Sequence, residues 1–249
     1  MKFFELPSLV FKLQINGVIT GNTYTKFLRD FNSAYLFKPK ALAVVVNSPG
    51  GTAVHADLIY RNIKAYSLLH KIPVLTFAED LAASGGYYIM CAGDELFASS
   101  PLSLFGSIGA VSSLPNIKDL ASKYGIERRH YSTSDMDFFS IYDPLDDYTT
   151  AKAKKVSTAL KEVNDEFRRV VMTNRKGKIT VSEDKVNDVV FNGDVFHAEK
   201  AIELGLVDGH GRCNEVIKER FPKARILALD SDAYGMRKVY KTLKEKLSN

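Results

Sequence analysis

The sequence has few features that would indicate a membrane span, a metal site or a disulfide framework. Its 249 residues include two cysteines, Cys91 and Cys213, which are far apart and outside any CxxC pair. We therefore expect two buried free thiols in a reducing compartment, with a single disulfide as the alternative. No histidine and cysteine cluster has the spacing of zinc ligands, so neither a metal nor a cofactor is expected. No apolar run approaches the ~18 residues of a transmembrane helix.

The excess of basic over acidic residues is also small. Lysine and arginine total 34 and aspartate and glutamate total 29, which gives a net charge of +5 and a pI near 9.0. This balance is a weak argument for nucleic-acid binding, and none is predicted. The surplus lies largely in residues 151–178 and 237–246, where a solvated helix face is the main interpretation. An acidic partner or an organelle interior is the alternative.

The first residues do not resemble a targeting segment. Lys2 is followed by Glu5 and Pro7 inside what would be the apolar core of a secretory signal. The stretch is also not the arginine-rich and serine-rich, acid-poor pattern of a transit peptide. We therefore expect an intracellular protein, in the cytoplasm or in an organelle interior such as the mitochondrial matrix.

The pattern of apolar residues predicts an α/β fold. Hydrophobic residues make up 45% of the chain and charged residues 25%, which is typical of a globular protein. Strands and helices are expected to alternate, as in βαβ units with a parallel sheet. The expected strands are residues 8–15, 42–46, 73–77, 95–98 and the LVDG segment at 206–209, and the expected helices are 54–70, 85–92, 151–174, 198–205 and 236–247.

Two glycine-rich turns follow two of the buried strands. The first is NSPGG at 47–51, and the second is ASGGYY at 83–88. Paired glycines let backbone N–H groups point into a cleft, where they hold an anion. Neither turn has the spelling of a nucleotide-binding loop. An oxyanion hole is the alternative use, and Ser84 then becomes a candidate nucleophile on a tight turn before a helix. The competing interpretation of Ser84 is an ordinary N-cap serine.

Four motifs together resemble the signal peptide peptidase A (protease IV) family of serine peptidases. They are NSPGG, SGGYY, GSIG at 106–109 and AIELGLVD at 201–208, in matching order and spacing. The resemblance covers roughly residues 8–220. It implies a ClpP/crotonase-like α/β superhelix of repeated ββα units in a single domain. We place that domain at 1–222 and a C-terminal extension with a basic helix at 223–249.

The resemblance also implies roles for individual residues. Ser84 matches the nucleophile, and Gly50, Gly51 and Gly85 match the backbone of the oxyanion hole. Ser107, in GSIG, matches a serine that supports the general base. Because family members assemble into oligomers, a homo-oligomer or a larger complex is expected, and a peptide is the expected ligand.

The sequence departs from the family at the general base. The family uses a lysine about fifty residues after the serine, and the amine acts as a base only when burial keeps it neutral. The corresponding positions here are near Asp135, Met136 and Asp137, and no lysine occurs between Lys123 and Lys152. An alignment shift therefore does not supply one.

Other bases are weaker candidates. His130 is the nearest histidine in sequence, but it is expected at the end of a strand and several residues before the family's lysine. Lys118 and Lys123 are expected to be solvated on a short helix. A lysine from a neighbouring subunit remains open.

Three functions stay open at this point. The first is a catalytically impaired pseudopeptidase that serves as a structural or peptide-binding subunit. The second is an active serine endopeptidase that degrades signal or membrane-derived peptides with a base from elsewhere. The third is a crotonase-type acyl-CoA enzyme, which the sequences of the two glycine-rich turns favour least.

Overall fold

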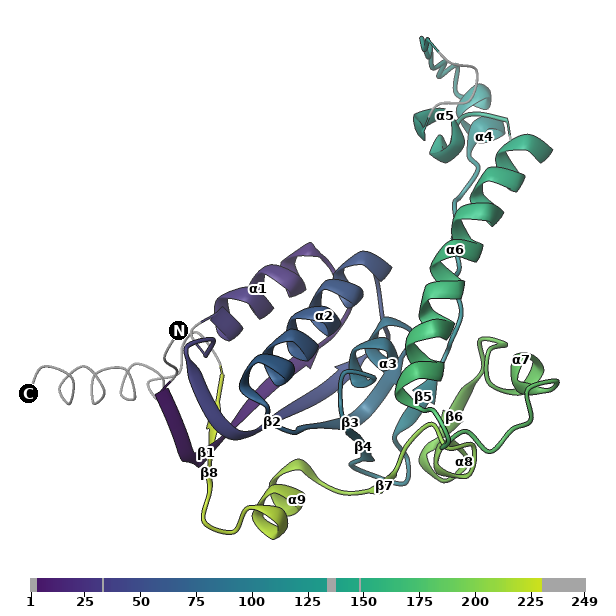
Figure 1. Ribbon diagram of the computed structural model, residues 1–249. Coiled ribbons are helices and arrows are strands. Elements are labelled where there is room, and N and C mark those ends of the chain that lie inside the picture. The colour runs from purple at the N-terminus through teal and green to yellow at the C-terminus, as the bar shows by residue number, and fades with distance from the viewer. Residues whose placement is uncertain (1–3, 33, 134–137, 148, 230–249) are drawn as a thin grey trace, which may run out of the picture. The chain divides into compact units, whose positions relative to one another are not determined.

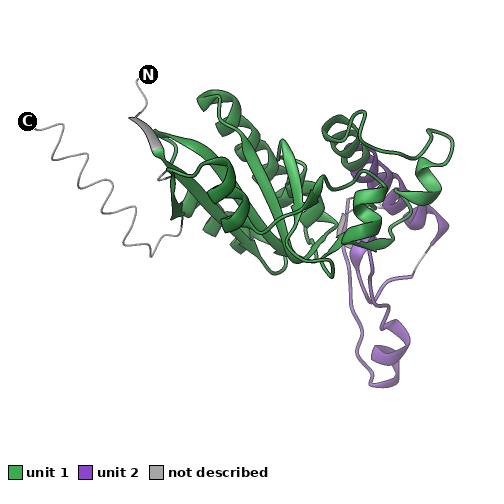
Figure 2. Ribbon diagram, turned by 90° about the horizontal axis from the view of Figure 1, so that it is seen from below, with its two compact units in different colours: residues 1–109, 167–249 green, residues 110–166 purple. Residues whose placement is uncertain are grey.

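The computed structural model describes residues 4–32, 34–133, 138–147 and 149–229. It is a mixed α/β structure built on one eight-stranded sheet, so the predicted fold class is confirmed. Contacts divide the chain into two compact units, residues 1–109 with 167–249 and residues 110–166, which Figure 2 colours separately.

The sheet of the first unit is mostly parallel. The order of its main strands is β6-β5-β3-β2-β1-β8, and β4 pairs with β3 and β7; the pair of β5 and β6 is antiparallel. The strands are β1 (Phe4–Asn16), β2 (Phe37–Ser48), β3 (Val74–Ala83), β4 (Glu95–Ala98), β5 (Leu104–Gly106), β6 (Val195–His197), β7 (Gly209–His210) and β8 (Arg225–Ala228).

Helices connect these strands and cover the sheet (Figure 1). The described helices are α1 (Gly21–Asn32), α2 (Ala53–His70), α3 (Gly85–Met90), α4 (Lys118–Lys123), α5 (Phe138–Tyr142), α6 (Thr150–Asn174), α7 (Val186–Val189), α8 (Ala198–Glu203) and α9 (Cys213–Arg220). Right after β1, β2 and β3, the chain turns into α1, α2 and α3 in succession. The ends of these three parallel strands therefore place three connecting turns at one edge of the sheet.

The core lies on both faces of the sheet. Alternate residues of β2 point to opposite faces, so Val44 and Val46 join the large cluster under α1 and α2. Ala43 and Val45 join a smaller cluster that α9 covers through Val216. Burial on both faces explains why β2 reads as a continuous apolar run rather than an alternating one.

The second unit is smaller, and several ion pairs join residues within it. It holds α4, α5 and the first part of α6. Lys118 pairs with Asp147 at 2.6 Å, and Arg128 pairs with Asp143 at 2.7 Å. Lys152, which is 9% exposed, pairs with Asp146 at 2.5 Å. Lys118, which was expected to be solvated, is a partly exposed residue that forms an ion pair.

Most expected elements are confirmed, and their ends are the main differences. The helices expected at 54–70, 151–174 and 198–205 are α2, α6 and α8, and β4 matches 95–98. The strand expected over LVDG begins only at Gly209. Cys91 and Cys213 are both buried and unbridged, which confirms the free thiols over the disulfide.

The C-terminal boundary stays a prediction. β8 follows residue 222 and pairs with β1, so the sheet extends past the expected end of the first domain. The helix expected at 236–247 lies outside the described residues. Among the helices that are described, none is both long and apolar enough to cross a bilayer.

Candidate active site

The two glycine-rich turns meet at one edge of the sheet. They follow β2 and β3, which are adjacent parallel strands. A Cβ atom built on Gly50 would lie 2.6 Å from the Cβ of Ser84 and 2.8 Å from the amide nitrogen of Gly85. Any side chain at position 50 would therefore displace the second turn. The glycine is required by this close approach and by its φ of 98°.

Ser84 sits in a strained backbone conformation. Its φ and ψ are 50° and −122°, outside the regions that side chains favour. Its N–H donates to the carbonyl of Gly106 at 2.8 Å. Although Ser84 occupies the N-cap position of α3, its hydroxyl does not cap that helix. The ordinary N-cap interpretation is therefore wrong, and the geometry is that of a sharp strand-to-helix turn that presents a hydroxyl.

The three glycines expected to form an oxyanion hole are not equivalent. The Gly50 amide already donates to Oγ of Ser48 at 3.1 Å, and that buried hydroxyl donates to the carbonyl of Gly17 at 2.7 Å. Within the described residues, the amides of Gly51 and Gly85 donate to no other group. These two amides, one from each turn, are the donors left for a ligand oxygen.

Ser107 lies beside the second turn. β5 pairs with the end of β3, with Ala83 opposite Gly106. Ser107 follows directly, with a φ of 50°, and its N–H donates to the carbonyl of Asp194 at 2.6 Å. The sheet therefore brings the strand end that carries Ser107 next to the strand end that carries Ser84.

The candidate bases belong to residues 110–166, the second unit. His130 is exposed in an irregular segment of the second unit, so the strand expected to end at this residue is wrong. Asp135, Met136 and Asp137, where the family's lysine is expected, lie outside the described residues. Lys123 is exposed on α4.

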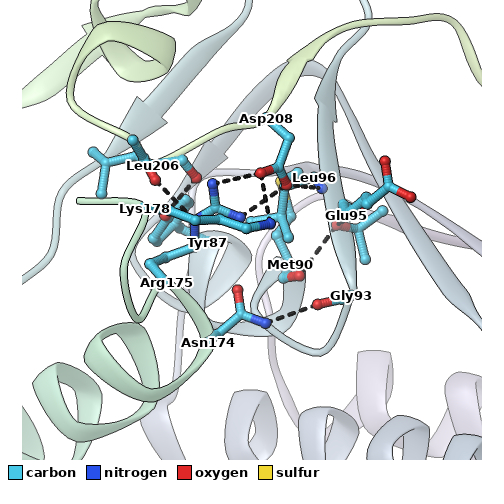
Figure 3. Close-up of polar contacts among 12 residues, drawn as sticks. Tyr87, Met90, Gly93, Glu95, Leu96, Asn174, Arg175, Lys178, Leu206 and Asp208 are labelled. Atoms are coloured by element: carbon cyan, nitrogen blue, oxygen red, sulfur yellow. Dashed lines mark hydrogen bonds and ion pairs between the residues drawn. The ribbon is translucent and has the colours of Figure 1, made fainter. Parts of the chain in front are cut away.

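One buried ion pair was not predicted from the sequence. Arg175 follows α6, is 1% exposed, and donates from Nη1 and Nη2 to the two carboxylate oxygens of Asp208, each at 2.9 Å (Figure 3). Its Nε donates to the carbonyl of Gly205 at 2.8 Å. Asp208 belongs to the AIELGLVD motif, which the sequence analysis singled out. Nothing in the spacing of the sequence indicated that Arg175 would be its ion-pair partner.

The surroundings of Asp208 keep it ionised. Burial alone would raise its pKa, but hydrogen bonds from Arg175, from Lys178 and from the amide of Leu96 lower the pKa to about 2. The hydroxyl of Tyr87, three residues after Ser84, donates to the neighbouring Leu206 carbonyl at 2.7 Å. Helix α3, which begins directly after Ser84, is therefore hydrogen-bonded to the segment that contains Asp208.

The comparisons with known proteins agree with these motifs. The model of Peptidase family S49 matches residues 67–226. "Protease 4" of Haemophilus influenzae is 28% identical over 88% of this chain, which spans 35% of that protein. "Probable protease SohB" of the same organism is 28% identical over 90% of this chain and 61% of its own length.

A further relative carries a different name. A protein of Brucella abortus named "Na(+)/H(+) antiporter NhaA" is 35% identical over 73% of this chain, which covers 24% of that protein. The chain therefore spans about a quarter to a third of the length of several curated relatives that it matches.

Proposed function

This chain belongs to peptidase family S49, and we propose that it is a catalytically impaired member that acts as a peptide-binding or structural subunit of an oligomer or larger complex. One observation carries the proposal. No lysine occurs between Lys123 and Lys152, and the positions near Asp135, Met136 and Asp137, where the resemblance to the family places the general base, lie in this window.

The loss of a base has a large effect on a serine peptidase. A serine hydroxyl is a weak nucleophile unless a neighbouring group takes its proton. Removing one member of such a catalytic unit typically costs several orders of magnitude in rate. Aspartates 135 and 137 flank the expected position, and carboxylates without a histidine are poor proton relays for a serine.

The remaining parts of the site suit binding better than turnover. The Gly51 and Gly85 amides are donors without an acceptor in the described chain. Gly85 directly follows Ser84, and Gly51 directly follows Gly50, whose Cβ position would lie 2.6 Å from the Cβ of Ser84. Such a pair would donate hydrogen bonds to the carbonyl oxygen of a peptide whether or not the serine reacts. We therefore include a peptide as the ligand of the proposed subunit.

An active serine endopeptidase is the second candidate, and the backbone of Ser84 favours it. A non-glycine residue held at a φ of 50° is strained, and such strain concentrates at functional sites. In this alternative the base is His130 or a lysine of a neighbouring subunit. The relatives named proteases support the class of reaction, but the present chain covers only part of them.

The proposal also includes an intracellular location and membership of the peptidase class rather than of the acyl-CoA enzymes. Two buried free thiols suit a reducing intracellular compartment. A crotonase-type acyl-CoA enzyme would share the oxyanion amides, and a coenzyme A binding assay separates it from both peptidase candidates.

The proposal is tested by turnover of casein and of a signal-peptide substrate. The wild-type protein is compared with Ser84→Ala and with His130→Ala. We expect no turnover above the level of Ser84→Ala. Turnover at ordinary peptidase rates that disappears in Ser84→Ala would establish the active endopeptidase instead, and its loss in His130→Ala would identify the base.

A further inference from the structure

The threonine that follows the first glycine-rich turn has its hydroxyl within hydrogen-bond distance of two groups. Thr52 occupies the N-cap position of α2, but its side chain does not cap the helix. Its Oγ1 lies 2.6 Å from Nδ1 of His55 and 3.3 Å from the carbonyl oxygen of Ile19. Because a hydroxyl carries one proton, it donates fully to only one of them at a time.

The Ile19 backbone fixes the position of this turn. The Ile19 N–H donates to the Gly50 carbonyl at 2.8 Å, and the Thr52 N–H donates to the Ile19 carbonyl at 2.9 Å. A Cβ atom at Gly51 would lie 2.1 Å from that same carbonyl oxygen. A second bond from Thr52 to Ile19 would therefore strengthen the link that holds the Gly51 amide in place.

The proton on His55 decides where the Thr52 hydroxyl donates. When Nδ1 is unprotonated, it accepts the hydroxyl proton, and Ile19 keeps only the backbone bond. When Nδ1 carries a proton, it donates to Oγ1, and the hydroxyl is free to donate to Ile19. We propose that His55 is a positioning residue for the Gly50–Thr52 turn and that its protonation tightens the turn through Thr52.

The titratable and charged groups around His55 come from α1 and α2. Its ring lies 3.6 Å from the position of a Cβ atom at Gly21 and 5.9 Å from the ring centroid of Tyr24, both on α1. Within the described residues, Tyr24 is the titratable group of that helix in contact with the ring. Asp57, on the same helix as His55, is engaged by Arg61 and by the Tyr88 hydroxyl. Among side chains in general, histidine is the one whose unperturbed charge change falls between pH 5 and 8, which is why the proposal is tested by a pH titration.

The inference rests on the proposed function only where it treats the turn as a ligand site. The coupling of His55 to the turn is a property of the folded chain and is measured without a ligand. Its failure is therefore distinguishable from failure of the proposed loss of activity, which the turnover assay tests separately.

The test is a pH titration of the full-length protein by ¹⁵N NMR, from pH 8 to pH 5. We expect the Gly51 and Thr52 amide signals to move with the same midpoint as the His55 ring nitrogens. We also expect Nδ1 to be unprotonated at high pH. Hydrogen-exchange protection of the Thr52 amide, corrected for intrinsic rates, should rise by about threefold to fivefold as His55 gains its proton, which is the effect of one added hydrogen bond.

Three variants separate this coupling from a merely structural effect. Thr52→Val keeps the backbone bond to Ile19 and removes the hydroxyl, so the turn should stop responding to the titration of His55. Thr52→Ser restores the hydroxyl and should restore the response. His210→Gln removes another histidine, one that contacts Glu199, and should leave the response intact.

Two results would overturn the proposal. One is a turn whose amides still titrate in Thr52→Val or in His55→Gln. The other is an Nδ1 that carries a proton throughout the pH range, because the Thr52 hydroxyl would then never change its acceptor.

Discussion

Arg175 and Asp208 form a bidentate ion pair that joins the segment after α6 to the AIELGLVD motif. Both bonds are 2.9 Å long, and the arginine side chain is almost entirely buried. Because Tyr87 donates to Leu206 in the same segment, the pair also supports the helix that begins directly after Ser84. The pair therefore belongs to the scaffold of the candidate site and lies outside its reacting groups.

The substitution Arg175→Met should destabilise the fold by about 3 kcal/mol, because it leaves the Asp208 carboxylate without its main partner. Urea unfolding followed by circular dichroism measures this loss. The matched control is Arg212→Met, whose pair with Glu215 is exposed and should contribute less than about 1 kcal/mol. Equal effects of the two substitutions would contradict a structural role for the buried pair.

Stability should depend on the charge of Asp208 at acid pH. Its pKa is about 2 in the folded protein, against about 3.9 for an unfolded chain. The unfolded state therefore takes up the proton first, so the contribution is complete above about pH 5 and is lost as the pH falls toward 2. The difference in unfolding free energy between wild type and Asp208→Asn should shrink from pH 6 to pH 3. A constant difference over that range would contradict the assignment.

Both cysteines should be unreactive in the folded protein. Burial raises the pKa of Cys91 to about 12 and that of Cys213 to about 11, so the reactive thiolate is scarce at pH 8. A colorimetric disulfide reagent should detect almost no thiol in the native protein and two thiols after denaturation in guanidinium chloride. Rapid labelling of either cysteine under native conditions would contradict this burial.

A lysine placed at position 136 should raise the activity. Met136 is where counting from Ser84 places the family's base. Met136→Lys should gain peptide turnover over the wild type, and the gain should disappear in Met136→Lys combined with Ser84→Ala. Ser122→Lys, at an exposed position on helix α4, adds the same single positive charge and is the control. A gain of equal size in that control would contradict the role of the position.

The fold and the two turns could be predicted because their signals are local. The apolar run at 42–46 and the helical spacing over 54–70 both depend on a period within the sequence, and β2 and α2 follow them. NSPGG and SGGYY predicted two glycine-rich turns whose backbone N–H groups point into a cleft. Parallel pairing of β2 and β3 then places these turns together.

The details that the sequence could not supply depend on contacts between distant segments. The occupied amide of Gly50 follows from the position of the Ser48 hydroxyl, which bonds to Gly17 thirty-one residues earlier. The partner of Asp208 lies thirty-three residues away at the end of another helix. His130 was expected at a strand end, but no strand includes or pairs with that segment among the described residues.

The central claim is that Ser84 lacks an effective base, and reaction with a fluorophosphonate probe tests it most directly. The purified protein at its native assembly mass is treated beside Ser84→Ala, with circular dichroism to show that both are folded. The account predicts no labelling of the wild type above the level of Ser84→Ala. Labelling of the wild type that disappears in Ser84→Ala would show an activated serine and contradict it.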